Sequence, residues 1–219
     1  MQTRSVLYEE LNQLRRELTL MASRVGEDLG KALVMLRSGS EELAEEVKES
    51  GKIVDALQLK IDDMALVLIA TQQPVARDLR ELITVFKITS SLERIGDYGI
   101  HLAKAAAKFS RKAPLRSVKR VEQMAETGQE MVMAAFSAYL AQDSEAARKV
   151  AALDEKIDDE HKALTEELLS LMKKKPELVK AAARLLRLSG YMERLGDHIT
   201  NICEGVIYMT EGSHEELNH

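Results

Sequence analysis

Aromatic residues are scarce in this chain, which contains no Trp, only 4% aromatic residues in total, and three Pro. A protein built from β-sheets usually contains more aromatic, β-branched and turn-forming residues than this. The chain is rich instead in Ala, Leu, Glu, Lys and Met, which favour helix. The composition therefore predicts an all-α protein.

Other shortages exclude whole classes of function. The net charge is −5, whereas a nucleic-acid-binding protein usually has an excess of basic residues to contact phosphates. The single Cys203 cannot form an internal disulfide, which is compatible with a reducing cytosol. The first residues contain no apolar segment typical of a secretory signal. The longest dense apolar run, 64–70, is far shorter than the ~20 residues that span a bilayer. We therefore expect a cytoplasmic protein that binds no nucleic acid and does not insert into a membrane.

The chain contains an internal repeat. The segment LERIGD at 92–97 returns as MERLGD at 192–197, and KIDD-type segments precede both copies, beginning at Lys52 and Asp154. This predicts two units, 1–110 and 111–219, of three helices each. We expect the six helices at 5–37, 40–71, 77–109, 115–141, 143–174 and 177–211.

The third and sixth predicted helices have the spacing of helices that pack along a seam. Apolar or small residues alternate at intervals of three and four, as in helical bundles. The short loops favour antiparallel neighbours and hence two three-helix bundles side by side. The seam positions are 85, 88, 92, 95, 99, 102, 106 and 109 in the third helix, and 188, 192, 195, 199, 202, 206 and 209 in the sixth.

Carboxylates recur beside these seams in both repeats. Glu93 is followed by Asp97 four residues later, and the second repeat has Glu193 and Asp197 at the same phase. Like charges at this spacing repel weakly on a helix, so the repetition calls for a reason beyond helix stability. We expect these side chains to face outward, where they form either a solvated charged surface or a site for a hard or borderline cation.

Two glycines stand within these acidic motifs. Gly96 and Gly196 each cost about 1 kcal/mol relative to Ala inside a helix. Their repetition predicts that another group approaches the helix closely at these points.

The segments QPVARDLR at 73–80, SLERIGD at 91–97, YMERLGD at 191–197 and NICEGV at 201–206 together resemble the PhoU family. The resemblance covers nearly the whole chain. It implies two three-helix bundles related by a pseudo-twofold axis, and acidic motifs that bind multinuclear metal clusters in some members. It also implies repression of phosphate-starvation signalling, by bridging a phosphate ABC transporter and a sensor histidine kinase. We further expect a homodimer.

The resemblance also implies a set of metal ligands and one departure from the family pattern. In the second helix the first acidic position is occupied by Gly51, so the first repeat lacks one ligand. The metal could be iron, zinc, manganese or magnesium. The implied ligands are Asp55, Glu93, Asp97, Asp154, Asp158, Glu193 and Asp197.

Two other interpretations remain open. The first is a metal-dependent enzyme, either a hydrolase or a di-metal carboxylate protein. The acidic motifs argue against a helical di-iron site of the Glu-x-x-His type, because Glu155 and Glu160 are followed three residues on by Asp158 and Ala163. No phosphate-binding Gly-rich loop is present either, so we expect no direct nucleotide chemistry. The leading interpretation remains a regulatory adaptor without catalysis. The second is that the carboxylates form only an acidic docking surface. His101 and His198 are further candidate ligands near the motifs, and Cys203 is expected to be a buried small residue.

Overall fold

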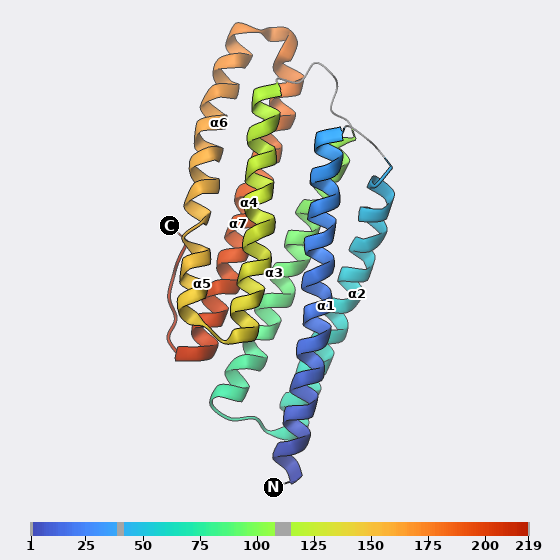
Figure 1. The fold of residues 1–219 in the computed structure, drawn as a ribbon, viewed down its shortest axis with the longest axis vertical. Coiled ribbons are helices and arrows are strands. Elements are labelled where there is room, and N and C mark those ends of the chain that lie inside the picture. Colours follow the sequence, from blue (N-terminus) through green and yellow to red (C-terminus); the bar gives the residue numbers. More distant parts are fainter. Residues whose placement is uncertain (1, 39–41, 108–114, 219) are drawn as a thin grey trace.

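The computed structural model describes residues 2–38, 42–107 and 115–218. Within these ranges the regular structure is entirely helical, and the long helices run roughly along one axis (Figure 1). This confirms the predicted all-α fold. The elements are α1 (Gln2–Ser38), α2 (Ala44–Gln72), α3 (Arg77–Ala106), α4 (Leu115–Ala141), α5 (Ser144–Ala151), α6 (Asp154–Lys174), a 3-10 turn (Pro176–Leu178) and α7 (Val179–Glu211).

The predicted seams are confirmed. Every seam position from 85 to 106 and from 188 to 209 is buried, while position 109 lies outside the described residues. In Figure 1, α3 and α7 run through the middle of the molecule, with α1 and α2 on one side and α4, α5 and α6 on the other. The two repeats meet where α3 packs on α7 and α1 packs on α4. Their buried apolar residues form one connected core. The predicted boundary at 110–111 falls outside the described residues.

One predicted helix is interrupted. The sequence pattern predicts a continuous helix over 143–174, but the structure ends α5 at Ala151 and begins α6 at Asp154. The side chain of Asp143 caps α5 by accepting a hydrogen bond from the backbone N–H of Ala146 at 2.9 Å. No Gly or Pro marks the interruption in the sequence. Its consequence is that Asp154 stands at the first position of α6, where the helix dipole favours a carboxylate.

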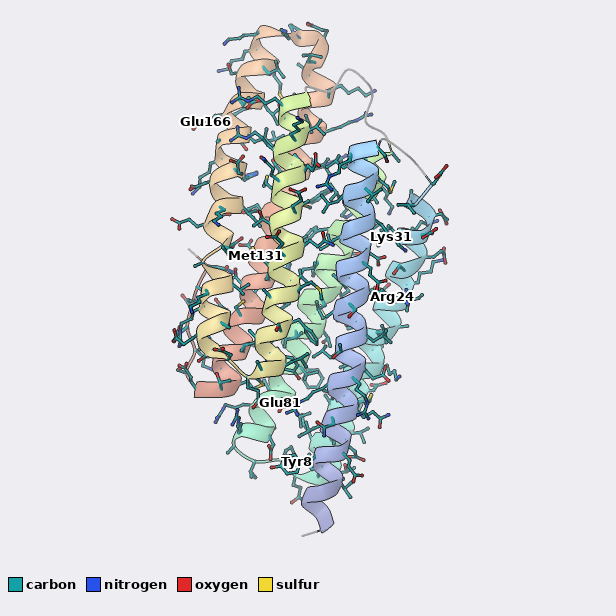
Figure 2. The ribbon with its side chains drawn as sticks, in the orientation of Figure 1. Tyr8, Arg24, Lys31, Glu81, Met131 and Glu166 are labelled. Carbon is teal, nitrogen blue, oxygen red and sulfur yellow. The ribbon has the colours of Figure 1, made fainter. Side chains whose placement is uncertain are left out.

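An ion pair inside the first repeat also receives a hydrogen bond from the second repeat. The Arg15 guanidinium on α1 donates from Nε and Nη2 to the two carboxylate oxygens of Glu81 on α3, each at 2.7 Å. The Tyr139 hydroxyl on α4 donates to Glu81 Oε1 at 3.4 Å. Glu81 lies inside the bundle with its side chain only 3% exposed (Figure 2). Three helices from both halves therefore depend on one carboxylate.

Candidate functional site

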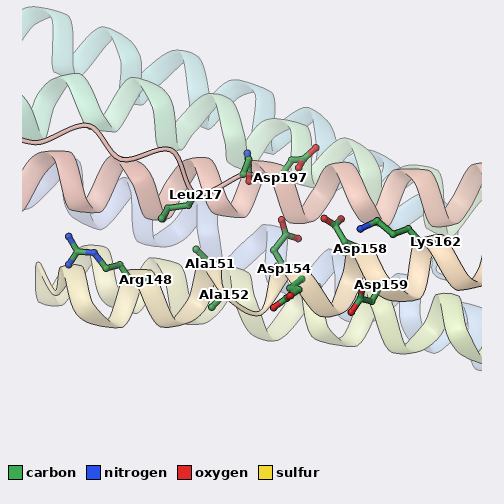
Figure 3. Close-up of a pocket in the computed structure, with 11 residues that line it drawn as sticks. Arg148, Ala151, Ala152, Asp154, Asp158, Asp159, Lys162, Asp197 and Leu217 are labelled. Carbon is green, nitrogen blue, oxygen red and sulfur yellow. The ribbon is translucent and has the colours of Figure 1, made fainter.

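The acidic residues of the second repeat gather between α6 and α7. Asp154 and Asp158 project from α6 toward α7, which carries Asp197 (Figure 3). These three side chains line one cavity of about 430 Å³. Glu193 stands one turn before Asp197 on α7 and is close enough to raise the pKa values of both Asp154 and Asp197. The structure thus brings together the four acidic residues that the sequence assigns to this repeat.

Asp154 does not lie on the surface, although the neighbouring Glu193 and Asp197 are predicted to face outward. Only 8% of the Asp154 residue is exposed to solvent. Thr200 on α7 donates a hydrogen bond from Oγ1 to Asp154 Oδ2 at 3.3 Å, whereas Asp154 Oδ1 is buried without a hydrogen-bond partner. Burial and the nearby charges of Asp158, Asp197 and Glu193 raise the pKa of Asp154 to about 7.

Gly196 makes this burial possible. A Cβ atom at this position would lie 1.9 Å from Asp154 Oδ1, far inside contact distance. The predicted close approach at this glycine is therefore confirmed, and the approaching group is the Asp154 carboxylate. The prediction is wrong for Gly96, where an added Cβ would make only an ordinary contact with Val54 at 3.6 Å.

The first repeat is built differently at the matching place. Gly51 occupies the position of Asp154, and an added Cβ there would lie 2.5 Å from Ile100 Cδ1. Ile100 in turn stands where the second repeat has Thr200. An apolar contact has thus replaced the Asp–Thr pair, and the space for a buried carboxylate is filled.

The remaining acidic residues of the first repeat are more exposed and lie beside a cation. Asp55 is exposed, and the side chains of Glu93 and Asp97 are 20% and 45% exposed. Arg94 lies 3.3 Å from Glu93 and 3.9 Å from Asp97. Burial raises the pKa of Glu93, the charges of Asp97 and Asp55 raise it further, and Arg94 opposes the shift.

The chemistry of the second repeat fits a hard cation better than that of the first. A buried carboxylate oxygen without a partner, surrounded by acids that repel one another, would be relieved by a bound cation. The first repeat has no such oxygen at Gly51. Within the described ranges, however, no three His, Cys, Asp or Glu side chains are close enough together to hold one ion. The side chains of the second repeat would have to rotate to share a metal.

Comparisons with known proteins agree with both repeats. The family model of the PhoU domain matches residues 18–106 and again residues 121–206. The chain belongs to the PhoU family. A phosphate-specific transport system accessory protein PhoU homolog of Clostridium acetobutylicum is 32% identical over 99% of each chain. A homolog of the same name from Aquifex aeolicus is 32% identical over 97% of this chain and 96% of its own.

Solved PhoU structures have the same fold. PhoU from Pseudomonas aeruginosa has a TM-score of 0.90 and 30% identity, over 94% of this chain and 99% of its own. The phosphate transport system regulatory protein PhoU from Streptococcus pneumoniae has a TM-score of 0.89 and 28% identity, over 96% and 99%. The names of these PhoU relatives describe accessory and regulatory proteins, which agrees with the expectation that this chain is not an enzyme.

His101, His198 and Cys203, which the sequence analysis also named, lie in aromatic or apolar surroundings in this PhoU chain. His101 and His198 contact aromatic rings between α3 and α7, and burial lowers the pKa of each. Cys203 is fully buried, as predicted, and burial raises the pKa of its thiol to about 12. A thiol in this state is a poor nucleophile. Within the described residues, no helix is both long enough and apolar enough to cross a membrane.

The sequence missed Glu81 and Thr200. Neither belongs to a repeated acidic motif, so no spacing rule identifies them. An acidic residue at a position that the seam pattern predicts to be buried could have pointed to Glu81, because such residues are nearly always paired.

Proposed function

We propose that this protein is a non-catalytic regulator of phosphate transport. It acts in the cytoplasm, where it represses phosphate uptake and phosphate-starvation signalling by bridging the phosphate ABC transporter and a sensor histidine kinase. The observation that carries this proposal is the match of the PhoU domain to both repeats, together with relatives that span nearly the full chain and are named for phosphate transport. A bridge between two partners needs two separate faces, and the duplicated bundle supplies them.

Deletion of the gene tests this role. A strain without the protein is expected to keep its phosphate-starvation response switched on in phosphate-rich medium, because the repressing contact is lost. Expression of a starvation-induced reporter measures the effect, and the intact gene on a plasmid should restore repression. Normal repression in the deletion strain, with no second copy in the genome, would overturn the proposal.

We further propose that the second repeat binds a divalent or trivalent metal ion, such as iron, zinc, manganese or magnesium, more tightly than the first. Asp154, Asp158, Glu193 and Asp197 would hold it, and the cation would neutralise a site that is otherwise strained by its own negative charge. The buried Asp154 oxygen without a partner supports this proposal. Asp55, Glu93 and Asp97 remain as a weaker site.

Metal content per chain tests the asymmetry between the repeats. The double variant Glu193→Gln with Asp197→Asn is expected to lose most of the bound metal, because it removes two of four carboxylates around a buried third. The matched variant Glu93→Gln with Asp97→Asn should lose clearly less. Metal per chain is measured by elemental analysis after loading and desalting.

Two results would contradict the metal proposal in different ways. Equal losses of metal from both double variants would show that the presence of Gly51, instead of an acidic residue, has no effect on metal binding by the first repeat. No metal in the wild-type protein after loading would favour an acidic docking surface. Hydrolytic or oxidative turnover by metal-loaded protein, lost in the second-repeat variant, would instead favour the metal-dependent enzyme.

A further inference from the structure

Four aromatic rings form a continuous stack between α3 and α7. His101 stacks on Tyr191 with ring centroids 4.7 Å apart, and Tyr191 stacks on Tyr98 at 5.8 Å. Tyr98 in turn contacts His198 at 5.9 Å. The stack therefore alternates between the two helices and ends at His198.

The internal repeat relates the two halves of this interface. Residues of α3 correspond to residues of α7 one hundred positions later, as the two acidic motifs show. Tyr98 thus corresponds to His198, and their contact lies at the pseudo-twofold axis. Tyr191 corresponds to Ser91, and His101 corresponds to Asn201. On one side of the axis Tyr191 and His101 extend the stack, whereas on the other side the matching positions hold the small polar side chains of Ser91 and Asn201.

The ring-poor side is hollow. A cavity of about 450 Å³ lies there, lined by Ser91, His198 and Asn201 together with Phe86, Lys87 and Glu204. The cavity is therefore the repeat counterpart of the place that Tyr191 fills on the other side. His198, which is partly exposed at one end of the ring stack, forms part of the cavity wall.

We propose that this α3–α7 cavity, which we call the ring pocket, binds an aromatic side chain of a partner protein. The ring would stack against His198 as Tyr191 stacks against Tyr98. The internal repeat supports this proposal, because the matching place on the other side of the axis is filled by the aromatic side chain of Tyr191. Aromatic pairs of this kind contribute about 0.5–1.5 kcal/mol beyond the burial of their area.

The charges at the rim favour a polypeptide over a small anion. Lys87 is exposed at one part of the rim, and Glu204 contributes a carboxylate at another. Glu204 also accepts a hydrogen bond from the backbone N–H of Leu217 at 2.9 Å, which holds it in place. A phosphate or nucleotide would meet this negative charge, whereas a peptide chain can present both a donor and an acceptor beside its aromatic residue.

A titration with a capped Ala-Trp-Ala peptide tests the ring pocket. The protein contains no Trp, so the indole N–H signal in an NMR spectrum belongs to the peptide alone. We expect saturable shifts of the protein amide signals at 86–91 and 198–204, with a Kd on the order of 1 mM because a single ring makes few contacts. A capped Ala-Ala-Ala peptide should cause no such shifts.

Ser91→Tyr is the decisive variant, because it places a tyrosine where the repeat has Tyr191 and should fill the ring pocket. We expect it to weaken peptide binding at least tenfold. The control Ser170→Tyr adds the same side chain at an exposed position of α6 and should bind like the wild type. Thermal unfolding of both variants checks that they remain folded.

Three results would overturn the proposal. The first is the absence of saturable shifts in the wild-type protein, and the second is unchanged binding by Ser91→Tyr. The third is AMP binding at least ten times more tightly than the peptide at the same amide signals, which would assign the ring pocket to a nucleobase. A folded Tyr191→Ser protein should gain a second set of shifts at 186–191, and failure to do so would refute the correspondence between the two sides.

Discussion

Asp154→Asn is expected to stabilise the metal-free protein by about 2–3 kcal/mol at pH 8. The pKa of Asp154 is raised to about 7 in the folded protein from an ordinary value of 3.8. Between these two pH values the unfolded chain releases its proton while the folded protein retains it. The free energy of unfolding therefore falls as the pH rises from about 4 to about 7. Asn cannot ionise, so the variant avoids this loss.

The stabilisation by Asp154→Asn should be large at pH 8 and small at pH 4. At pH 4 the carboxyl group is protonated in the folded protein and only about half ionised in the unfolded chain. The variant should therefore differ little from the wild type at this pH. Urea denaturation at pH 4 and pH 8, with chelator present, measures the difference. Asp63→Asn, at an exposed position of α2, is the control and should change stability by less than about 0.5 kcal/mol at either pH. A destabilised Asp154→Asn protein at pH 8 would show that the carboxylate stabilises the metal-free fold.

Arg15→Met is expected to destabilise the protein by about 2–4 kcal/mol. The substitution keeps much of the side-chain volume but removes both hydrogen bonds to Glu81, which is then left buried with only Tyr139 as a partner. An unpaired buried carboxylate costs more than the pair contributes, because it loses its hydration without compensation. The estimate lies below that for a fully buried pair, because the Arg15 side chain is 31% exposed.

A second arginine provides a matched control for this effect. Arg37 also extends from α1 to reach α4, where it pairs with Glu122, but its side chain is 49% exposed. Arg37→Met should therefore cost less than about 1 kcal/mol. Adding Glu81→Gln to Arg15→Met should recover part of the loss, because the buried charge is removed. Equal costs for the two arginine variants in urea denaturation would contradict the special role of the Glu81 network.

The helical content and the core positions could be predicted from the sequence because they depend on local patterns. The three-and-four spacing of apolar residues repeats over many turns in α3 and α7, so errors at single positions have little effect. The interruption between α5 and α6 could not be predicted in this way. Its residues, around Ala152, are good helix formers, and the interruption lies between two helices that both pack on α7.

The candidate site was predicted in its composition but not in its depth. The repeated motifs identified Glu93, Asp97, Glu193 and Asp197 as one kind of site because equivalent residues recur at equal spacing. They could not show that Asp154 is buried, since its exposure depends on how closely α6 approaches Gly196. The contact between Asp154 and Gly196 also makes the two repeats chemically different, because Gly51 and Ile100 fill the matching space in the first repeat.

The sequence by itself determined the helical class, the duplication, the seams and the family, because all four are encoded in the order and spacing of residues along the chain. Only the tertiary structure decided which carboxylate loses its water, which charge is paired, and which side of the α3–α7 interface remains open. These properties depend on distances between residues far apart in sequence, such as Asp154 and Gly196, Arg15 and Glu81, or Tyr98 and His198. Burial and charge pairing act through such distances, and the spacing of residues along a single helix does not specify them.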